Sequence, residues 1–187
     1  MVSTGFANLD HELPGGGWPC HSLTELLSPQ PAVLEWRLLG PSLRAIVARG
    51  QQVVVIGPPQ YPHLPGLRHE GVDERHLIWI RAETPSERLW ATEQLIKSNA
   101  AGALMAWLPQ ARPEQLRRLQ VCARSCVGPV FLFRPDKARF EASPAPLRMQ
   151  VTFGPDWELR VHLLKRRGPV HDGILQLPSI PAASPRF

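Results

Sequence analysis

The side chains most able to form a chemical site are three cysteines and seven histidines. Cys20 and His21 are adjacent, and Cys122 and Cys126 are four residues apart, so together they could supply the nitrogen and sulfur ligands of a zinc ion. However, the Cys122 and Cys126 spacing follows the apolar stripe of a helical segment, which is typical of buried cysteines. We therefore expect these cysteines to pack in the core, and we predict no metal site.

Three histidines, His63, His69 and His76, lie in a loop-rich stretch and are the next candidates for chemistry. A catalytic triad needs a nucleophile and a carboxylate arranged around the imidazole, and no serine or carboxylate pattern accompanies these residues. Exposed loop histidines are the simpler interpretation. The sequence thus offers no catalytic residue, and we expect a protein that is not an enzyme.

Basic residues are the third group, and their distribution is uneven. The net charge is +5, from 21 Lys and Arg against 16 Asp and Glu, yet residues 1–30 contain no lysine or arginine while residues 110–140 are rich in them. Such asymmetry can serve nucleic acid or an acidic partner, and it is equally compatible with a solvated surface. The candidate contact residues are Arg117, Arg118, Arg124, Lys165, Arg166 and Arg167.

The elements that would position these side chains alternate along the chain. Apolar runs predict strands at 22–27, 51–57, 76–80, 103–108 and 129–133, with helices expected at 32–49, 84–99 and 113–125. Arg117 and Arg124 are two helical turns apart and should face outward from the last of these helices. The alternation predicts an α/β fold with a mostly parallel sheet covered on both faces.

Local signals refine this outline. Gly40 and Pro41 should interrupt the helix over 32–49, because proline lacks the N–H that a helix interior uses. Thr84, Pro85 and Glu87 form a capping-box sequence that should begin a helix.

The C-terminal part follows a different pattern. Residues 147–153 and 158–164 should pair as an antiparallel hairpin at the sheet edge. Residues 1–170 are thus expected to form one domain, followed by a proline-rich flexible tail over 171–187.

The tryptophans were also assigned by position. Trp36, Trp79, Trp90 and Trp107 fall in predicted helices or strands and are expected to be buried. Trp18 and Trp157 lie in predicted turns, which makes them candidates for a contact surface or for lids over a core edge.

Three segments of the chain follow patterns that are found in other proteins. The opening STGFANLDHELPGGGWPCHSLTELL resembles the start of the RecA-like core, and ELRVHLLKRRG resembles the strand near its end. The segment GVDERHLIWIRAETPSERLWATEQLIKSNAAGALMAWL is similar to both the ImuA family of translesion-synthesis proteins and the cell-division inhibitor SulA. SulA-type proteins lack the opening and closing motifs, so the resemblance favours ImuA over residues 3–168.

The resemblance implies a three-layer RecA-like fold but also draws attention to three altered positions. A RecA-like ATPase carries Gly-Lys-Ser/Thr after its first strand, where this chain has Leu-Ser-Pro-Gln-Pro-Ala at 27–32. The expected catalytic glutamate after the second strand is replaced by Gly-Pro-Pro-Gln at 57–60, and the expected aspartate by Ala-Trp-Leu-Pro at 106–109. We therefore predict a degenerate RecA-like domain that lacks a functional P-loop and binds no cofactor.

As function, the resemblance implies a non-enzymatic accessory factor in SOS-induced mutagenic translesion synthesis. Its partners would be an ImuB-type Y-family polymerase-like protein, RecA and an error-prone DnaE-type polymerase, with DNA as a further ligand. The alternatives are a SulA-like inhibitor that binds FtsZ and a working ATPase or strand-exchange protein. ImuA-like chains usually extend further upstream, where RecA-type filaments carry a docking segment, so we expect weak or no self-assembly.

The same sequence gives an expectation for the compartment. Its cysteines are sparse and odd in number, and it has neither a signal peptide pattern nor a membrane-length apolar run. We therefore expect a cytoplasmic protein without membrane contact.

Overall fold

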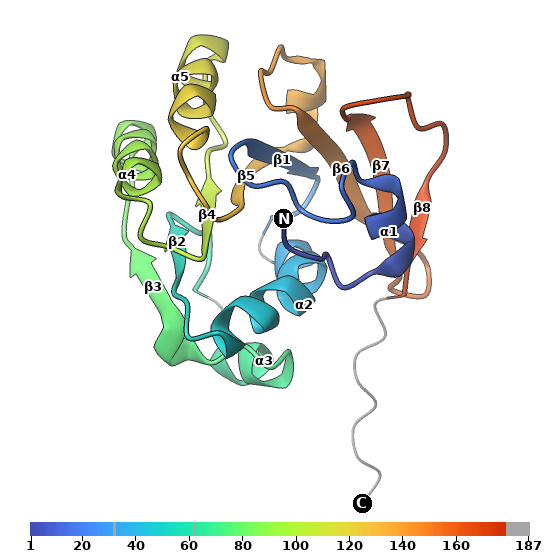
Figure 1. Ribbon diagram of the computed structural model, residues 1–187, viewed down its shortest axis with the longest axis horizontal. Coiled ribbons are helices and arrows are strands. Elements are labelled where there is room, and N and C mark those ends of the chain that lie inside the picture. Colours follow the sequence, from blue (N-terminus) through green and yellow to red (C-terminus); the bar gives the residue numbers. More distant parts are fainter. Residues whose placement is uncertain (32, 62, 179–187) are drawn as a thin grey trace, which may run out of the picture.

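The computed structural model describes residues 1–31, 33–61 and 63–178, which form an α/β fold around an eight-stranded sheet of order β3-β2-β4-β5-β1-β6-β7-β8 (Figure 1). The neighbours from β3 to β6 run parallel, and β7 and β8 are added antiparallel. The predicted α/β class with a mostly parallel sheet is therefore confirmed. The strands are β1 (Leu23–Ser28), β2 (Val53–Ile56), β3 (Leu77–Ile80), β4 (Ala103–Trp107), β5 (Val130–Pro135), β6 (Leu147–Phe153), β7 (Leu159–Lys165) and β8 (Leu175–Leu177).

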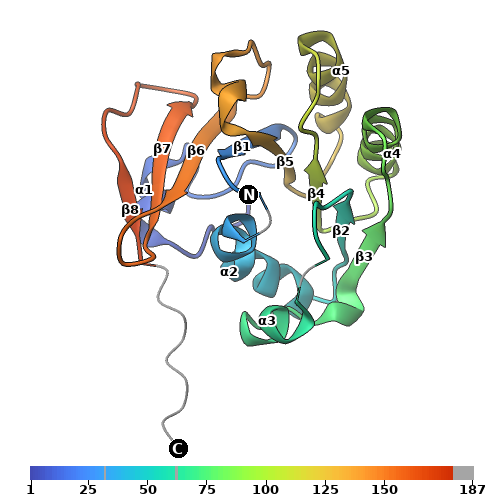
Figure 2. The ribbon, with the colours of Figure 1, turned by 180° about the vertical axis from the view of Figure 1, so that it is seen from behind.

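Helices cover both faces of the sheet (Figures 1 and 2). On one face, Leu9, Leu43 and Leu67 pack against sheet residues such as Met105 and Phe131. The opposite face has its own apolar layer, in which residues of two further helices meet the alternate side chains of β2, β4 and β5. The helices of the first face are α1 (Ala7–Glu12), α2 (Leu34–Ala48) and α3 (Leu64–His69); those of the second are α4 (Pro85–Ser98) and α5 (Pro113–Ala123), and the short 3-10 turns are η1 (Glu74–His76) and η2 (Asp136–Phe140).

Two of the central strands, β2 and β4, are apolar throughout because both of their faces are covered. Each of their residues is buried, which explains why they appear in the sequence as continuous apolar runs and not as alternating ones. Strand β1 is buried as well, but it includes Thr24, Glu25 and Ser28. By contrast, β7 alternates buried residues with more exposed ones, as expected for a strand with one solvated face.

Two local predictions have different outcomes. The capping box of α4 is confirmed, since Thr84 Oγ1 accepts from the Glu87 N–H at 3.2 Å and Glu87 Oε2 accepts from the Thr84 N–H at 3.0 Å. The predicted interruption at Gly40 and Pro41 is wrong, because α2 continues through Pro41. Buried Leu38, Leu39 and Leu43 flank this proline, and their packing offsets its poor helix propensity.

The C-terminal boundary also needs correction, because the predicted tail over 171–187 begins too early. Leu175–Leu177 form β8, which pairs with β7 and contributes the fully buried Leu177. The Asn8 side-chain amide further holds this strand by donating to the Gln176 carbonyl at 2.9 Å. The predicted two-stranded hairpin therefore becomes a three-stranded antiparallel end of the sheet, and the rest of the tail, 179–187, lies outside the described residues.

For Trp18 the structure favours the lid over a core edge and not the contact surface, and for Trp90 it corrects the prediction of burial. Trp18 is fully buried, stacks edge-on against Phe131 at 5.2 Å between ring centroids, and donates its indole N–H to Ser42 Oγ at 2.8 Å. Its turn lies over the core, so Trp18 is not a contact surface. Trp90, which was expected to be buried, is 67% exposed on the outer side of α4, while Trp157 is exposed as its turn position suggested.

Candidate functional site

Ligands of α/β proteins commonly bind where the carboxyl ends of parallel strands meet, and here that edge is rich in proline. The loops that follow β1, β2, β4 and β5 surround a cavity of about 110 Å³. Its walls include the aromatic rings of Trp107 and Phe133, whose centroids are 4.4 Å apart. The prolines that line it are Pro29, Pro31, Pro59, Pro109 and Pro135.

This crevice is poorly suited to an anionic ligand. Proline has no backbone N–H to donate to a phosphate oxygen, and the volume is well below the roughly 300 Å³ at which small-molecule pockets begin. Three charged side chains of the described residues line the cavity. Glu35 is buried, with one oxygen accepting the Trp107 indole N–H at 3.2 Å. Arg134 is paired with Glu25 and Glu141, and Arg88 donates its Nε–H to the Ala82 carbonyl at 3.0 Å.

Beside this crevice lies a buried group of charges that sequence reasoning missed. Glu25, in the middle of β1, is fully buried between two arginines: Arg134 Nη1 donates to one carboxylate oxygen at 2.9 Å and Arg148 Nε to the other at 2.6 Å. Arg134 also pairs with Glu141 at 2.6 Å. The network thus balances two positive against two negative groups. The sequence signal that could have indicated this network is one charged residue in each of three largely apolar strands: Glu25 in β1, Arg134 in β5 and Arg148 in β6.

Further hydrogen bonds complete this network. Arg134 donates to the Leu108 and Ala111 carbonyls, and Arg148 donates to the Ala138 carbonyl at 2.8 Å. Buried guanidinium groups are stable only when they are paired and hydrogen-bonded in this way. The network therefore fixes the loop after β4 and the η2 turn against β1.

The six basic residues predicted from sequence fall on two elements. Arg117, Arg118 and Arg124 are exposed along the outer side and at the end of α5, whose inner side buries Leu116 and Leu119. The other three, Lys165, Arg166 and Arg167, lie at and just beyond the end of β7.

Three of these six side chains already have partners. Arg118 pairs with Glu93 at 2.9 Å, Lys165 donates to the Ser143 carbonyl at 3.0 Å, and Arg166 pairs with Glu12 at 2.9 Å. The pKa of Glu93 is lowered, first by its hydrogen bond with Lys97 and then by Arg118. The pKa of Glu12 is lowered by hydrogen bonds from His11 and Arg166.

The remaining three basic side chains have no such partner. Within the described parts of the chain, the side chains of Arg117, Arg124 and Arg167 form neither an ion pair nor a hydrogen bond. An exposed cation without an internal partner keeps its full capacity to bind an external anion. These three arginines are therefore the strongest of the predicted contact residues.

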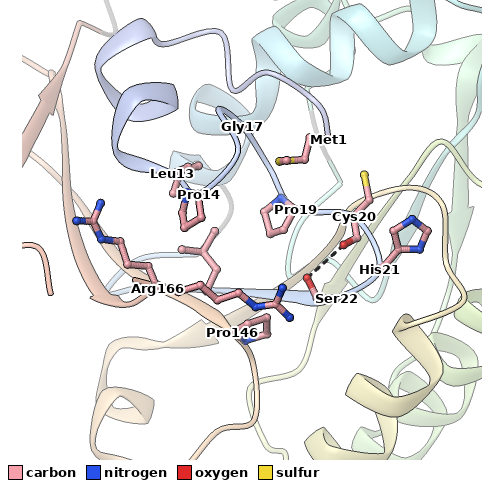
Figure 3. Close-up of a pocket in the computed structure, with 12 residues that line it drawn as sticks. Met1, Leu13, Pro14, Gly17, Pro19, Cys20, His21, Ser22, Pro146 and Arg166 are labelled. Atoms are coloured by element: carbon pink, nitrogen blue, oxygen red, sulfur yellow. Dashed lines mark hydrogen bonds between the residues drawn. The ribbon is translucent and has the colours of Figure 1, made fainter. Parts of the chain in front are cut away.

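The structure brings Arg166 and Arg167 into a pocket of about 420 Å³ (Figure 3). The pocket lies at the amino ends of β1 and β6, because Ser22 directly precedes β1 and Pro146 directly precedes β6. Its other wall is the loop after α1, which includes Leu13, Pro14, Pro19, Cys20 and His21.

Arg124 belongs to the same edge of the sheet, at the end of α5. The His21 N–H donates to the Cys126 carbonyl at 3.1 Å, which ties the pocket loop to the segment just after Arg124. Arg117 lies further along α5. The structure thus joins the end of β7 and the end of α5 at one edge, although it does not merge all six basic residues into one cluster.

The cysteines and loop histidines form no recognisable site. Cys126 is buried, and this burial raises the pKa of its thiol, while Cys20 and Cys122 are half-buried. His63 and His69 are exposed at α3, and His76 is half-buried in η1. In the described residues, no group of three or more His, Cys, Asp or Glu side chains is placed to hold a metal ion.

No protein-family model and no curated protein matches the chain. Among the helices that the structure describes, none has both the length and the apolar character needed to span a membrane.

Proposed function

We propose that this protein is a RecA-like domain without nucleotide chemistry that serves as a non-enzymatic accessory factor in SOS-induced translesion synthesis, as the resemblance to the ImuA family implies. The observation that carries the proposal is the small proline-lined crevice at the carboxyl ends of β1, β2, β4 and β5. The eight-stranded α/β sheet with antiparallel C-terminal strands is compatible with a three-layer RecA-like core.

The crevice supports the loss of ATPase activity in chemical terms. A phosphate-binding loop uses consecutive backbone N–H groups, a lysine and a hydroxyl, and Pro29 and Pro31 remove two of those donors. Of the two arginines in the described lining, Arg134 is already paired with Glu25 and Glu141, and the buried Glu35 carboxylate offsets the charge of Arg88. A working ATPase or strand-exchange protein is therefore disfavoured.

The basic surface supports action through contacts. Arg117, Arg124 and Arg167 are available for an acidic protein surface or for DNA phosphates, because they have no partner in the described chain. The partners that we propose are an ImuB-type polymerase-like protein, RecA and a DnaE-type polymerase. Binding to such partners requires no catalytic residue, so the proposed role is that of a connector in the cytoplasm.

Co-purification of the full chain with an ImuB-type protein tests this proposal. We expect a stable complex that persists through gel filtration, and failure to form one would refute the role. A light-scattering assay of FtsZ polymerisation tests the SulA-like alternative in parallel. We expect no inhibition at equimolar protein, and stoichiometric inhibition would favour the alternative.

A further inference from the structure

The pocket at the amino ends of β1 and β6 combines an apolar floor with an unpartnered cation. Leu13, Pro14, Pro146 and Leu147 supply apolar walls, and Figure 3 shows Leu13 and Pro14 on one side with Pro146 on the other. Arg167 lines the same pocket. Its volume of about 420 Å³ lies within the range of roughly 300 to 1,000 Å³ that is usual for ligand pockets.

The wall of this pocket is held in place by buried contacts. Trp18, next to Gly17 and Pro19 of the pocket, pairs with Val2 through backbone hydrogen bonds of 2.7 and 3.3 Å. Its indole N–H is fixed by Ser42, whose hydroxyl in turn donates to the Ser3 carbonyl at 2.9 Å. The pocket is thus formed before any ligand arrives, which reduces the entropic cost of binding.

The two arginines of the pocket have different roles. Arg166 is neutralised, because it donates to both the carboxylate and the backbone carbonyl of Glu12 and also to the Pro169 carbonyl. Arg167 has no partner within the described residues. One uncompensated guanidinium beside an apolar floor matches a carboxylate, which it can bind through two parallel hydrogen bonds.

The lining also discriminates between classes of macromolecule. Single-stranded nucleic acid is usually held by aromatic side chains that stack on its bases and by several cations that follow its phosphates. The described residues that line this pocket include no Phe, Tyr or Trp, and only one uncompensated arginine. A peptide with an apolar side chain next to a carboxylate fits both the floor and the charge.

We propose that this pocket is the docking site for an extended segment of the partner protein in which a leucine-like side chain adjoins an Asp or Glu. This inference rests on the proposed role as a connector, since it names the chemistry that the partner presents. The apolar side chain packs between Leu13 and Pro146, and the carboxylate pairs with Arg167.

A titration of the ¹⁵N-labelled full chain tests the site directly. The probe is the blocked peptide acetyl-Gly-Leu-Asp-Leu-Gly-amide, and the control is the same peptide with Asn in place of Asp. We expect the Asp peptide to shift the amide resonances of residues 20–22 and 166–168, and the Asn peptide to bind about tenfold more weakly. Equal binding of the two peptides, or no shift at these amides, would overturn the proposal.

Two variants sharpen the assignment. Arg167→Gln should weaken the Asp peptide about tenfold, because a charge-assisted pair is replaced by a neutral contact. Arg49→Gln removes an exposed arginine at the end of α2, which lies outside the pocket and is not one of the predicted contact residues. Its side chain has no ion pair or hydrogen bond within the described residues, and the variant should leave peptide binding unchanged. Similar losses in both variants would show that binding is only a response to net charge, and would overturn the site.

The same variants separate this inference from the proposed function. If the ImuB-type complex forms and Arg167→Gln does not weaken it, the pocket assignment fails while the accessory role remains. If no complex forms but the Asp peptide binds selectively, the pocket stands as a carboxylate-peptide site and the accessory role fails. A short oligothymidylate that shifts the pocket amides when the peptide does not would show a nucleic-acid site and overturn the inference.

Discussion

The carboxyl ends of the parallel strands close on prolines and a balanced charge network, whereas the amino ends of β1 and β6 open into a pocket that contains an unpartnered arginine. At the first edge, Arg134 pairs with Glu25 and Glu141, and Arg148 pairs with Glu25. At the second, Glu12 neutralises Arg166 but leaves Arg167 available.

This difference suggests separate roles for the two edges of the sheet: the carboxyl edge stabilises the fold, and the amino edge binds the proposed partner. In most α/β proteins the carboxyl edge holds the ligand. Here the carboxyl edge contributes buried ion pairs, and the pocket with its unpartnered arginine lies at the opposite edge. Changes at the first edge should therefore affect stability, and changes at the second should affect binding.

The largest effect is expected for Glu25→Ala, which would leave Arg134 and Arg148 buried without their shared carboxylate. Breaking a buried pair in this way costs about 3–5 kcal/mol, measurable as a lower urea midpoint. Glu141→Ala is the matched control, because Glu141 is 45% exposed and its loss should be much smaller. Equal losses in the two variants would show that Glu25 does not organise the network.

Charge reversal of the basic surface comes next. Changing Arg117, Arg124 and Arg167 together to Glu should weaken binding of the ImuB-type partner at least about tenfold, and more at low salt than at high salt. The melting temperature should barely change, because none of the three has an internal partner. Binding that is unaffected at low salt would assign these arginines to solubility.

The basic residues at the end of β7 provide the contrast, because Lys165 and Arg166 have partners and Arg167 has none within the described residues. Reversing all three charges should weaken partner or DNA binding as well, but Arg166→Glu also places a carboxylate beside Glu12. We therefore expect Arg166→Glu alone to lower the melting temperature, unlike Arg167→Glu. Identical melting temperatures for these two single variants would argue against the Glu12 contact.

A smaller loss of folding stability is expected from a change at the start of α4, which takes part in neither the charge network nor the pocket. Thr84→Ala should cost about 1 kcal/mol, because the Glu87 N–H loses its capping oxygen. Ser86→Ala serves as the control, because Ser86 lies two residues after Thr84 and is exposed. We expect little change in the free energy of unfolding of this variant. Partner binding should be the same in both variants, and an unchanged stability in Thr84→Ala would contradict the cap.

No effect is expected from ATP with magnesium on the melting temperature. A ligand at 100 times its dissociation constant stabilises a protein by about 2.7 kcal/mol, so binding would be readily visible. A clear upward shift would show that nucleotide is held despite the prolines at the carboxyl edge, and would remove the difference between the two edges.

Much of the fold was predictable because strands such as β2 and β4 are buried on both faces and therefore appear as continuous apolar runs. The start of α4 was also predictable, since its capping box is local. In contrast, α1 and β8 are too short to carry a periodic signal. Asp10 holds α1 by accepting from the Thr4 N–H at 2.8 Å, and β8 depends on its pairing with β7.

The candidate site was predictable only in part. The basic residues were visible in the sequence, but which of them are neutralised depends on partners that are distant along the chain. Arg166 meets Glu12 across 154 residues, and Arg134 meets Glu25 across 109. Such pairs follow from the topology of the sheet, which no local pattern specifies. The exposure of Trp90 was missed, and the choice between a contact surface and a lid for Trp18 stayed open, for the same reason.

The position of β1 in the sheet has a consequence for biosynthesis. Although β1 is made first, its neighbours are β5 and β6, with Leu23 in register with Val130 and Thr24 in register with Leu147. During translation β1 therefore stays unpaired until most of the chain has been synthesised. Non-local pairing of this kind slows folding and populates intermediates that are prone to aggregation, so the nascent chain should depend on chaperones until β6 emerges from the ribosome.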